Sequence, residues 1–183
     1  MYFADMTRKE SIEQIFEAGS NGDPIARSVM GMLLYEAGMH EQGTDLLKEM
    51  AGKGIIWARD LLATIARGEN SNHIRHKTGL TPLTEKQLVN YVAQGNIYAM
   101  TVIGILKQRM NDEKQKSVGI EYLDAAKNAG CLWAEDQLKP IPPRGPGFFG
   151  SGETSLLKWA EKRGVPAPSE KDWIRIVSKK YGY

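Results

Sequence analysis

Residues 95–104 read Gly-Asn-Ile-Tyr-Ala-Met-Thr-Val-Ile-Gly, and their pattern decides the fold. Counting from the glycine, an alanine stands at +4, an apolar residue at +8 and a small residue at +9. Three other segments share the glycine, the alanine and the apolar residue, and all four glycines have apolar residues at −7 and −4. Such self-similarity indicates a repeat architecture. The glycine–alanine pairs are Gly22 and Ala26, Gly54 and Ala58, Gly95 and Ala99, and Gly130 and Ala134.

Each copy of this glycine template predicts two helices joined at the glycine. Positions −7 and −4 share one face of a helix, and a glycine directly after that helix adopts the left-handed conformation without a Cβ clash. Positions +4, +8 and +11 line one face of the next helix. Asp23-Pro24, Asn96 and Thr84-x-x-Gln87 are start signals. The helices are expected at 8–18, 24–37, 41–53, 55–67, 84–94, 96–109, 114–129 and 131–139, with no strand.

The small residues at +4 and +9 let neighbouring helices approach closely. One isolated helix pair cannot cover its own apolar face, so the pairs are expected to stack on one another. The predicted fold is all-α: an α-solenoid of antiparallel helix pairs over residues 1–139, closed by a helical C-terminal cap.

The repeats are similar to those of the Sel-one-like repeat family, a branch of the tetratricopeptide-like α-solenoids. Ala99…Ile103-Gly104 matches the family's first-helix element, as do the corresponding residues of the first copy, Ala26…Met30-Gly31. Tyr122-Leu123…Ala126…Gly130…Ala134 matches the second. The chain departs from the family at Ala63, at Met50 and in the loop Gly68–Leu83. The resemblance implies a protein-binding superhelix whose first helices line the concave surface; bacterial members include regulators, assembly factors and immunity proteins.

A proline-rich segment ends the predicted repeats. Residues 140–152 form a Pro/Gly-rich connector, because prolines remove backbone donors and force extended geometry. Residues 153–183 follow as the cap, with amphipathic helices expected at 153–163 and 169–181. A solenoid needs such an atypical end to cover its last apolar face.

Composition and charge exclude several classes of protein. The 183 residues are 42% hydrophobic and 25% charged, which is typical of a globular chain and not of a disordered one. No membrane span or signal peptide is evident, so a cytoplasmic protein without membrane association is expected. Residues 1–70 hold seven Lys/Arg and eleven Asp/Glu, whereas residues 139–183 hold nine and four. Dispersed charge of this kind favours a solvated surface over nucleic-acid binding.

The chain offers few candidates for chemistry. Gly145–Gly150 has the letters of a dinucleotide-binding motif but follows prolines instead of a strand, so it is interpreted as a connector. His73-x-x-His76 lacks two further metal ligands. Cys131 stands at a helix start, which lowers a thiol pKa, but its place after a template glycine favours packing. We therefore expect no enzyme, with no catalytic residue, cofactor or metal.

The predicted function is that of a non-enzymatic scaffold or adaptor that binds another protein. Positions +5, +6 and +13 lie on the helix that follows each glycine, which corresponds to the family's first helix, and they point away from the predicted core. Some of these positions hold arginines, which an acidic segment of a partner would suit. The alternative is nucleic-acid binding by the basic C-terminal helices. The candidate partner-binding residues are Arg27, Tyr35, Arg59, Arg67, Met100, Thr101 and Gln108.

Overall fold

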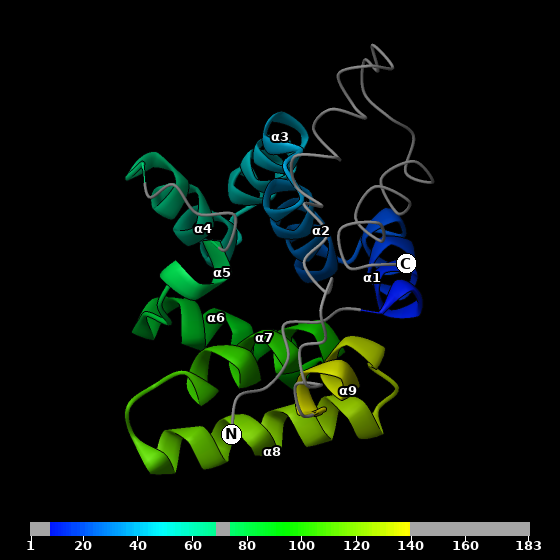
Figure 1. The fold of residues 1–183 in the computed structure, drawn as a ribbon, viewed down its shortest axis with the longest axis vertical. Coiled ribbons are helices and arrows are strands. Elements are labelled where there is room, and N and C mark those ends of the chain that lie inside the picture. The colour runs from blue at the N-terminus through cyan, green and yellow to red at the C-terminus, as the bar shows by residue number, and fades with distance from the viewer. Residues whose placement is uncertain (1–7, 69–73, 140–183) are drawn as a thin grey trace, which may run out of the picture. The chain divides into compact units, whose positions relative to one another are not determined.

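The computed structural model describes residues 8–68 and 74–139, and this part of the chain is all-α (Figure 1). It contains no strand between these limits, which confirms the predicted class of secondary structure. The helices are α1 (Lys9–Ser20), α2 (Pro24–Glu36), α3 (His40–Gly52), α4 (Ile56–Ala66), α5 (Ile74–Lys77), α6 (Pro82–Ala93), α7 (Ile97–Gln108), α8 (Glu113–Asn128) and α9 (Leu132–Leu138).

Hydrophobic periodicity located every helix of this region except α5. The eight expected helices between residues 8 and 139 match the observed ones to within a few residues at each end. α5 lies inside the expected loop Gly68–Leu83. It is a single helical turn, too short for a periodic signal to develop. The connector at 140–152 and the helices at 153–163 and 169–181 lie outside the described residues.

The described residues fall into two compact units, divided between Thr78 and Gly79. The N-terminal unit contains α1 to α5, and the C-terminal unit contains α6 to α9. Within each unit, helices that follow one another along the chain pack together. α2 contacts α1, α3, α4 and α5, and α7 contacts α6, α8 and α9, so these two helices are enclosed on several sides.

The four template glycines end helices in the way their positions predict. Gly22, Gly54, Gly95 and Gly130 have φ between 83° and 102°. This is the left-handed region that favours glycine, because a Cβ would clash there. The next residue but one after each glycine lies at the beginning of a new helix, so the glycine allows the chain to turn.

Side-chain caps fix two helix starts where the sequence predicted them and two where it did not, at Thr81 before α6 and at Asp112 before α8. Asp23 Oδ1 accepts from the amides of Ile25 and Ala26, at 2.9 Å each. Asn96 Oδ1 accepts in the same way from the first turn of α7. The expected start at Thr84 is wrong, because Thr81 Oγ1 accepts from the Thr84 amide at 3.2 Å and Pro82 begins the helix. Proline suits this first position, since its missing N–H has no intrahelical partner there.

Pairs of glycines mark the closest approach of two helices in each unit. A Cβ on Gly43 of α3 would lie 2.6 Å from the carbonyl oxygen of Gly31 of α2. A Cβ on Gly119 of α8 would lie 2.8 Å from the carbonyl oxygen of Gly104 of α7. No real Cβ tolerates such distances to a backbone atom, so only glycine permits these crossings. Gly31 and Gly104 are the small residues at template position +9.

The template positions also supply the core. The alanines at +4 are all fully buried, and so are Leu47 and Leu123 at −7. Position +3, which the sequence did not single out, is a further core position with large side chains in every copy. Its residues are Ile25, Trp57, Tyr98 and Trp133, all at most 4% exposed.

A buried ion pair attaches α5 to α2. Arg75 donates from Nε to Glu36 Oε1 at 2.8 Å, and its second contact to the same oxygen is 2.6 Å. The two side chains are 4% and 1% exposed. Two charges taken out of water are tolerated only when they compensate each other, so neither residue can be changed alone without cost.

We expect Gly104→Ala to destabilise the protein by about 1–3 kcal/mol, because the new Cβ would lie 2.6 Å from Leu123 Cγ and 2.9 Å from the Gly119 carbonyl oxygen. Gly52→Ala is the matched control, since nothing lies within 4 Å of a Cβ at this helical position. The control is expected to be neutral or slightly stabilising. Chemical denaturation followed by circular dichroism measures both, and equal stability of the two variants would contradict the close crossing.

We expect Arg75→Met to cost about 3–5 kcal/mol, because it leaves the Glu36 carboxylate buried without its guanidinium. The double variant Glu36→Leu/Arg75→Met removes both charges and is expected to recover most of that loss. The denaturant midpoints of the two variants and of the wild type measure these differences in stability. A double variant no more stable than the single one would show that the pair is not the source of the cost.

Candidate protein-binding surface

The seven candidate residues are distributed over both units. Arg27 and Tyr35 lie on α2, and Arg59 and Arg67 belong to α4 and its C-terminal end. Met100, Thr101 and Gln108 lie on α7 in the C-terminal unit. The two groups are therefore described separately, each within its own unit.

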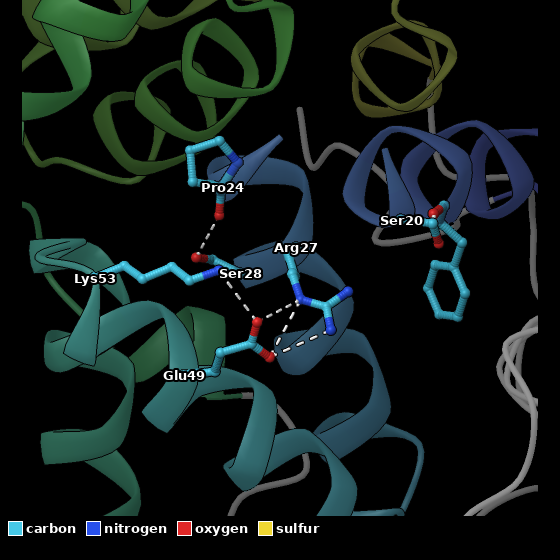
Figure 2. Close-up of polar contacts among 7 residues, drawn as sticks. Ser20, Pro24, Arg27, Ser28, Glu49 and Lys53 are labelled. Atoms are coloured by element: carbon cyan, nitrogen blue, oxygen red, sulfur yellow. Dashed lines mark hydrogen bonds and ion pairs between the residues drawn. The ribbon is translucent and has the colours of Figure 1, made fainter. Parts of the chain in front are cut away.

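Arg27 is engaged within its own unit. Its guanidinium straddles the Glu49 carboxylate of α3, with Nε 3.2 Å from Oε1 and the second nitrogen 3.2 Å from Oε2 (Figure 2). Lys53, the residue directly after α3, also approaches Glu49 Oε1, at 3.4 Å. Arg27 thus connects α2 to α3, and its charge is already compensated by a bidentate contact.

The pKa of Glu49 reports this pairing. The hydrogen bond from Arg27 is the largest cause that holds the pKa of Glu49 below its ordinary value of 4.5. Burial opposes it as the second-largest contribution, and Lys53 adds to the lowering. A carboxyl group whose pKa is lower in the folded protein stabilises the fold above its unfolded pKa. That contribution is lost as the pH falls through the folded pKa.

Tyr35 lies in the last turn of α2. Its ring stacks on His40, with centroids 4.4 Å apart and an angle of 26° between the planes. Its backbone nitrogen faces Gly43 at the close crossing, 2.6 Å from where a Cβ would stand. Tyr35 is therefore half-buried, and its ring packs against the first residue of α3 instead of being fully available to a partner.

The prediction that Thr101 is exposed is wrong. Thr101 is fully buried, and its hydroxyl donates to the Ile97 carbonyl oxygen at 2.8 Å while lying 3.3 Å from Cys131 Sγ. Met100 and Gln108 are half-buried. α7 therefore carries no exposed ladder at these three positions.

The error has one physical cause, which also acts on α2. Ser28, at the same template position as Thr101, is fully buried and donates to the Pro24 carbonyl oxygen at 2.8 Å (Figure 2). The prediction assumed that a first helix buries one face, but α2 and α7 each pack against at least three other helices. A small hydroxyl residue fits such an enclosed position because it is satisfied by its own helix.

Arg59 and Arg67 are the candidates that the structure leaves exposed. They share one side of α4 with two exposed alanines, and the one acidic residue of this helix, Asp60, is half-buried. Neither arginine forms an ion pair with a carboxylate of the described residues, in contrast to Arg27 and Arg75. We call this surface the arginine face; it consists of Arg59, Ala63, Ala66 and Arg67.

A pair of buried threonines holds Arg67 in place. Thr64 Oγ1 accepts from the Arg67 guanidinium at 3.0 Å and lies 2.7 Å from Thr78 Oγ1, which itself donates to the Ile74 carbonyl oxygen. Lys77, directly before Thr78, is exposed. The sequence analysis missed this lysine and the two threonines; the threonines come together only when α5 packs against α4.

The structure also places the candidate groups for chemistry. Cys131 is 1% exposed, and burial raises the pKa of its thiol, so the helix start does not activate it. His73, the His76 side chain and the glycine motif Gly145–Gly150 lie outside the described residues. Within the described part of the chain, no three His, Cys, Asp or Glu side chains come together in a way that would hold a metal ion.

No family model, curated protein or solved structure matches this chain. Among the helices of residues 8–68 and 74–139, none combines the length and the apolar character that a membrane span requires. The case for a function therefore rests on the packing and the surface described above.

We expect Glu49→Gln to lower the stability at neutral pH by about 0.2–1 kcal/mol, the usual value of an exposed ion pair. The difference from the wild type should persist down to about pH 4.5 and disappear below the folded pKa of Glu49, because the wild-type carboxyl group is then protonated. Thermal unfolding between neutral and acidic pH measures this. Glu41→Gln, an equal charge change at an exposed residue of α3, is the control, and the same pH dependence in both variants would contradict the role of Glu49.

Proposed function

We propose that this chain is a non-enzymatic protein-interaction scaffold, built as an α-solenoid of Sel-one-like helix pairs. The observation that carries the proposal is the recurrence of one packing unit in both parts of the described chain. Gly31, Gly43 and Leu47 of the N-terminal unit correspond to Gly104, Gly119 and Leu123 of the C-terminal unit. The same crossing made twice, far apart in the sequence, is typical of a repeat and not of an irregular helical domain.

The residues that face each other at these crossings support antiparallel pairing. On α2, Gly31 faces Leu47 whereas the later residue Tyr35 faces the earlier residue Gly43. Residue numbers that run in opposite directions along two helices indicate antiparallel axes. α7 and α8 repeat the relation: Gly104 faces Leu123, and Gln108 faces Gly119.

Repeat arrays suit binding because each pair contributes a similar face to one extended surface. In this chain the enclosed helices α2 and α7 are used mainly for packing, so binding falls to the helices with a free side, of which α4 carries exposed arginines that have no ion pair to a described carboxylate. The buried, packing role of Cys131 is consistent with the absence of a nucleophilic function. The family resemblance implies a partner that is a protein.

Site-specific photo-crosslinking tests the proposal. A benzoylphenylalanine is placed at an exposed position of one helix at a time, at Lys48 of α3, Ala66 of α4 or Lys127 of α8, in the full chain produced in its native cells. We expect at least one position to give a discrete adduct whose size is reduced by protease and not by nuclease. The three positions lie on different helices, so the result also reports which surface is used.

The control is the wild-type chain irradiated in parallel. Adducts that nuclease removes would support the nucleic-acid alternative instead. The absence of a protein adduct from all three positions, with each variant as stable as the wild type, would contradict the scaffold.

A further inference from the structure

We propose that the arginine face of α4 binds an acidic segment of the partner protein, with Lys77 at its edge. The proposal deepens the scaffold function and rests on it. Three observations on the described residues carry it: the uncompensated charge of Arg59 and Arg67, the shape of the surface between them, and the contact that orients Arg67.

The charge of this face runs against that of its surroundings. Residues 1–70 are net acidic, with eleven Asp/Glu against seven Lys/Arg. Where a carboxylate is available to an arginine, the fold uses it: Arg27 is paired with Glu49, and Arg75 with Glu36. Arg59 and Arg67 remain without an ion pair to any described carboxylate although acidic residues outnumber basic ones. Charge complementarity therefore points to carboxylates supplied from outside the unit.

The shape of the face fits a peptide segment. Arg59 and Arg67 are eight residues apart, which places their Cα atoms about 12 Å apart along the helix. The two exposed alanines between them, Ala63 and Ala66, lie within the same sector of about 100°. Short side chains between two long cationic ones let a partner backbone approach α4 while its carboxylates reach the guanidinium groups at either end.

Arg67 is pre-organised for such a contact. Its guanidinium is held by Thr64, and Thr64 is held in turn by Thr78, both threonines being at most 4% exposed. A hydroxyl acceptor orients the guanidinium without neutralising it. An oriented guanidinium loses less conformational entropy when it forms a bidentate contact with a carboxylate.

The number of cations favours a protein partner over a phosphate polymer. The surface presents two arginines and one lysine on one turn of α5 and one side of α4. Backbone phosphate recognition normally uses a longer stripe of basic residues. Two arginines whose Cα atoms are about 12 Å apart along a helix match two acidic side chains separated by two turns of a helix.

The test is a titration of the full-length, isotope-labelled chain with an alanine-based helical peptide that carries glutamates two turns apart. We expect amide shifts in residues 59–67 and 77, which salt weakens because both charges are exposed. Arg59→Gln/Arg67→Gln should weaken binding about tenfold. The matched control is Lys86→Gln/Lys127→Gln, which removes the same charge from exposed positions on α6 and α8 and should bind as the wild type does.

Three outcomes would overturn the proposal: no shift at α4, equal weakening by both double variants, or tighter binding of a single-stranded oligonucleotide than of the peptide at the same residues. None of these outcomes contradicts the proposed scaffold function, because crosslinks from α3 or α8 would still show a protein partner at those helices. Conversely, peptide binding at α4 without any protein crosslink in cells would leave the surface intact and contradict the function.

A second variant separates charge from orientation. Thr64→Val removes the acceptor that holds Arg67 while the formal charge stays the same. We expect it to weaken peptide binding two- to threefold and to broaden the signal of the Arg67 Nη2–H that contacts Thr64, whereas thermal unfolding checks that the fold survives. If Arg67 becomes mobile in Thr64→Val and peptide binding nevertheless stays unchanged, pre-organisation of Arg67 plays no part.

Discussion

The close approach of two helix backbones is the constraint on which the rest of the structure depends. At Gly31 and Gly43, and again at Gly104 and Gly119, the helices are so close that the carbonyl oxygen of one occupies the space of a Cβ on the other. The leucine one turn beyond each crossing, Leu47 or Leu123, is then fully buried. Dispersion attraction grows steeply as surfaces approach. The absence of a side chain at these glycines therefore allows closer packing along the whole helix pair.

Enclosure of α2 and α7 follows from this close packing and decides which side chains remain available. A helix that packs on several neighbours has no single solvent face, so even hydroxyl residues such as Ser28 and Thr101 are buried in it. They are accepted because each donates to a carbonyl of its own helix. Exposed polar side chains are consequently found on less enclosed helices, of which α4, with its two exposed arginines, is an example.

The enclosed positions also determine which charged side chains have partners within their own unit. Buried or half-buried cations are compensated inside the units: Arg75 by Glu36, Arg27 by Glu49, and Lys107 by Glu85 with a further hydrogen bond to Gln115. A cation taken from water without a partner is costly, so these pairs are needed for folding and are not free to bind. The exposed arginines of α4 are under no such requirement, because water solvates their charge.

The sequence was enough to assign every described helix except α5, together with the glycine ends and two of the caps. These features are local: periodicity, a left-handed φ and an N-cap oxygen act within a few residues, so the segments around Gly22, Gly54, Gly95 and Gly130 could be assigned without coordinates. Only the tertiary structure decided which template positions are exposed, because burial on α2 and α7 depends on neighbours from elsewhere in the chain. It also decided the Glu36–Arg75 pair, whose residues are 39 positions apart, and the single turn α5 that brings Thr78 to Thr64. No local pattern encodes such contacts, since each of these residues is polar and would be expected at the surface from its residue type alone.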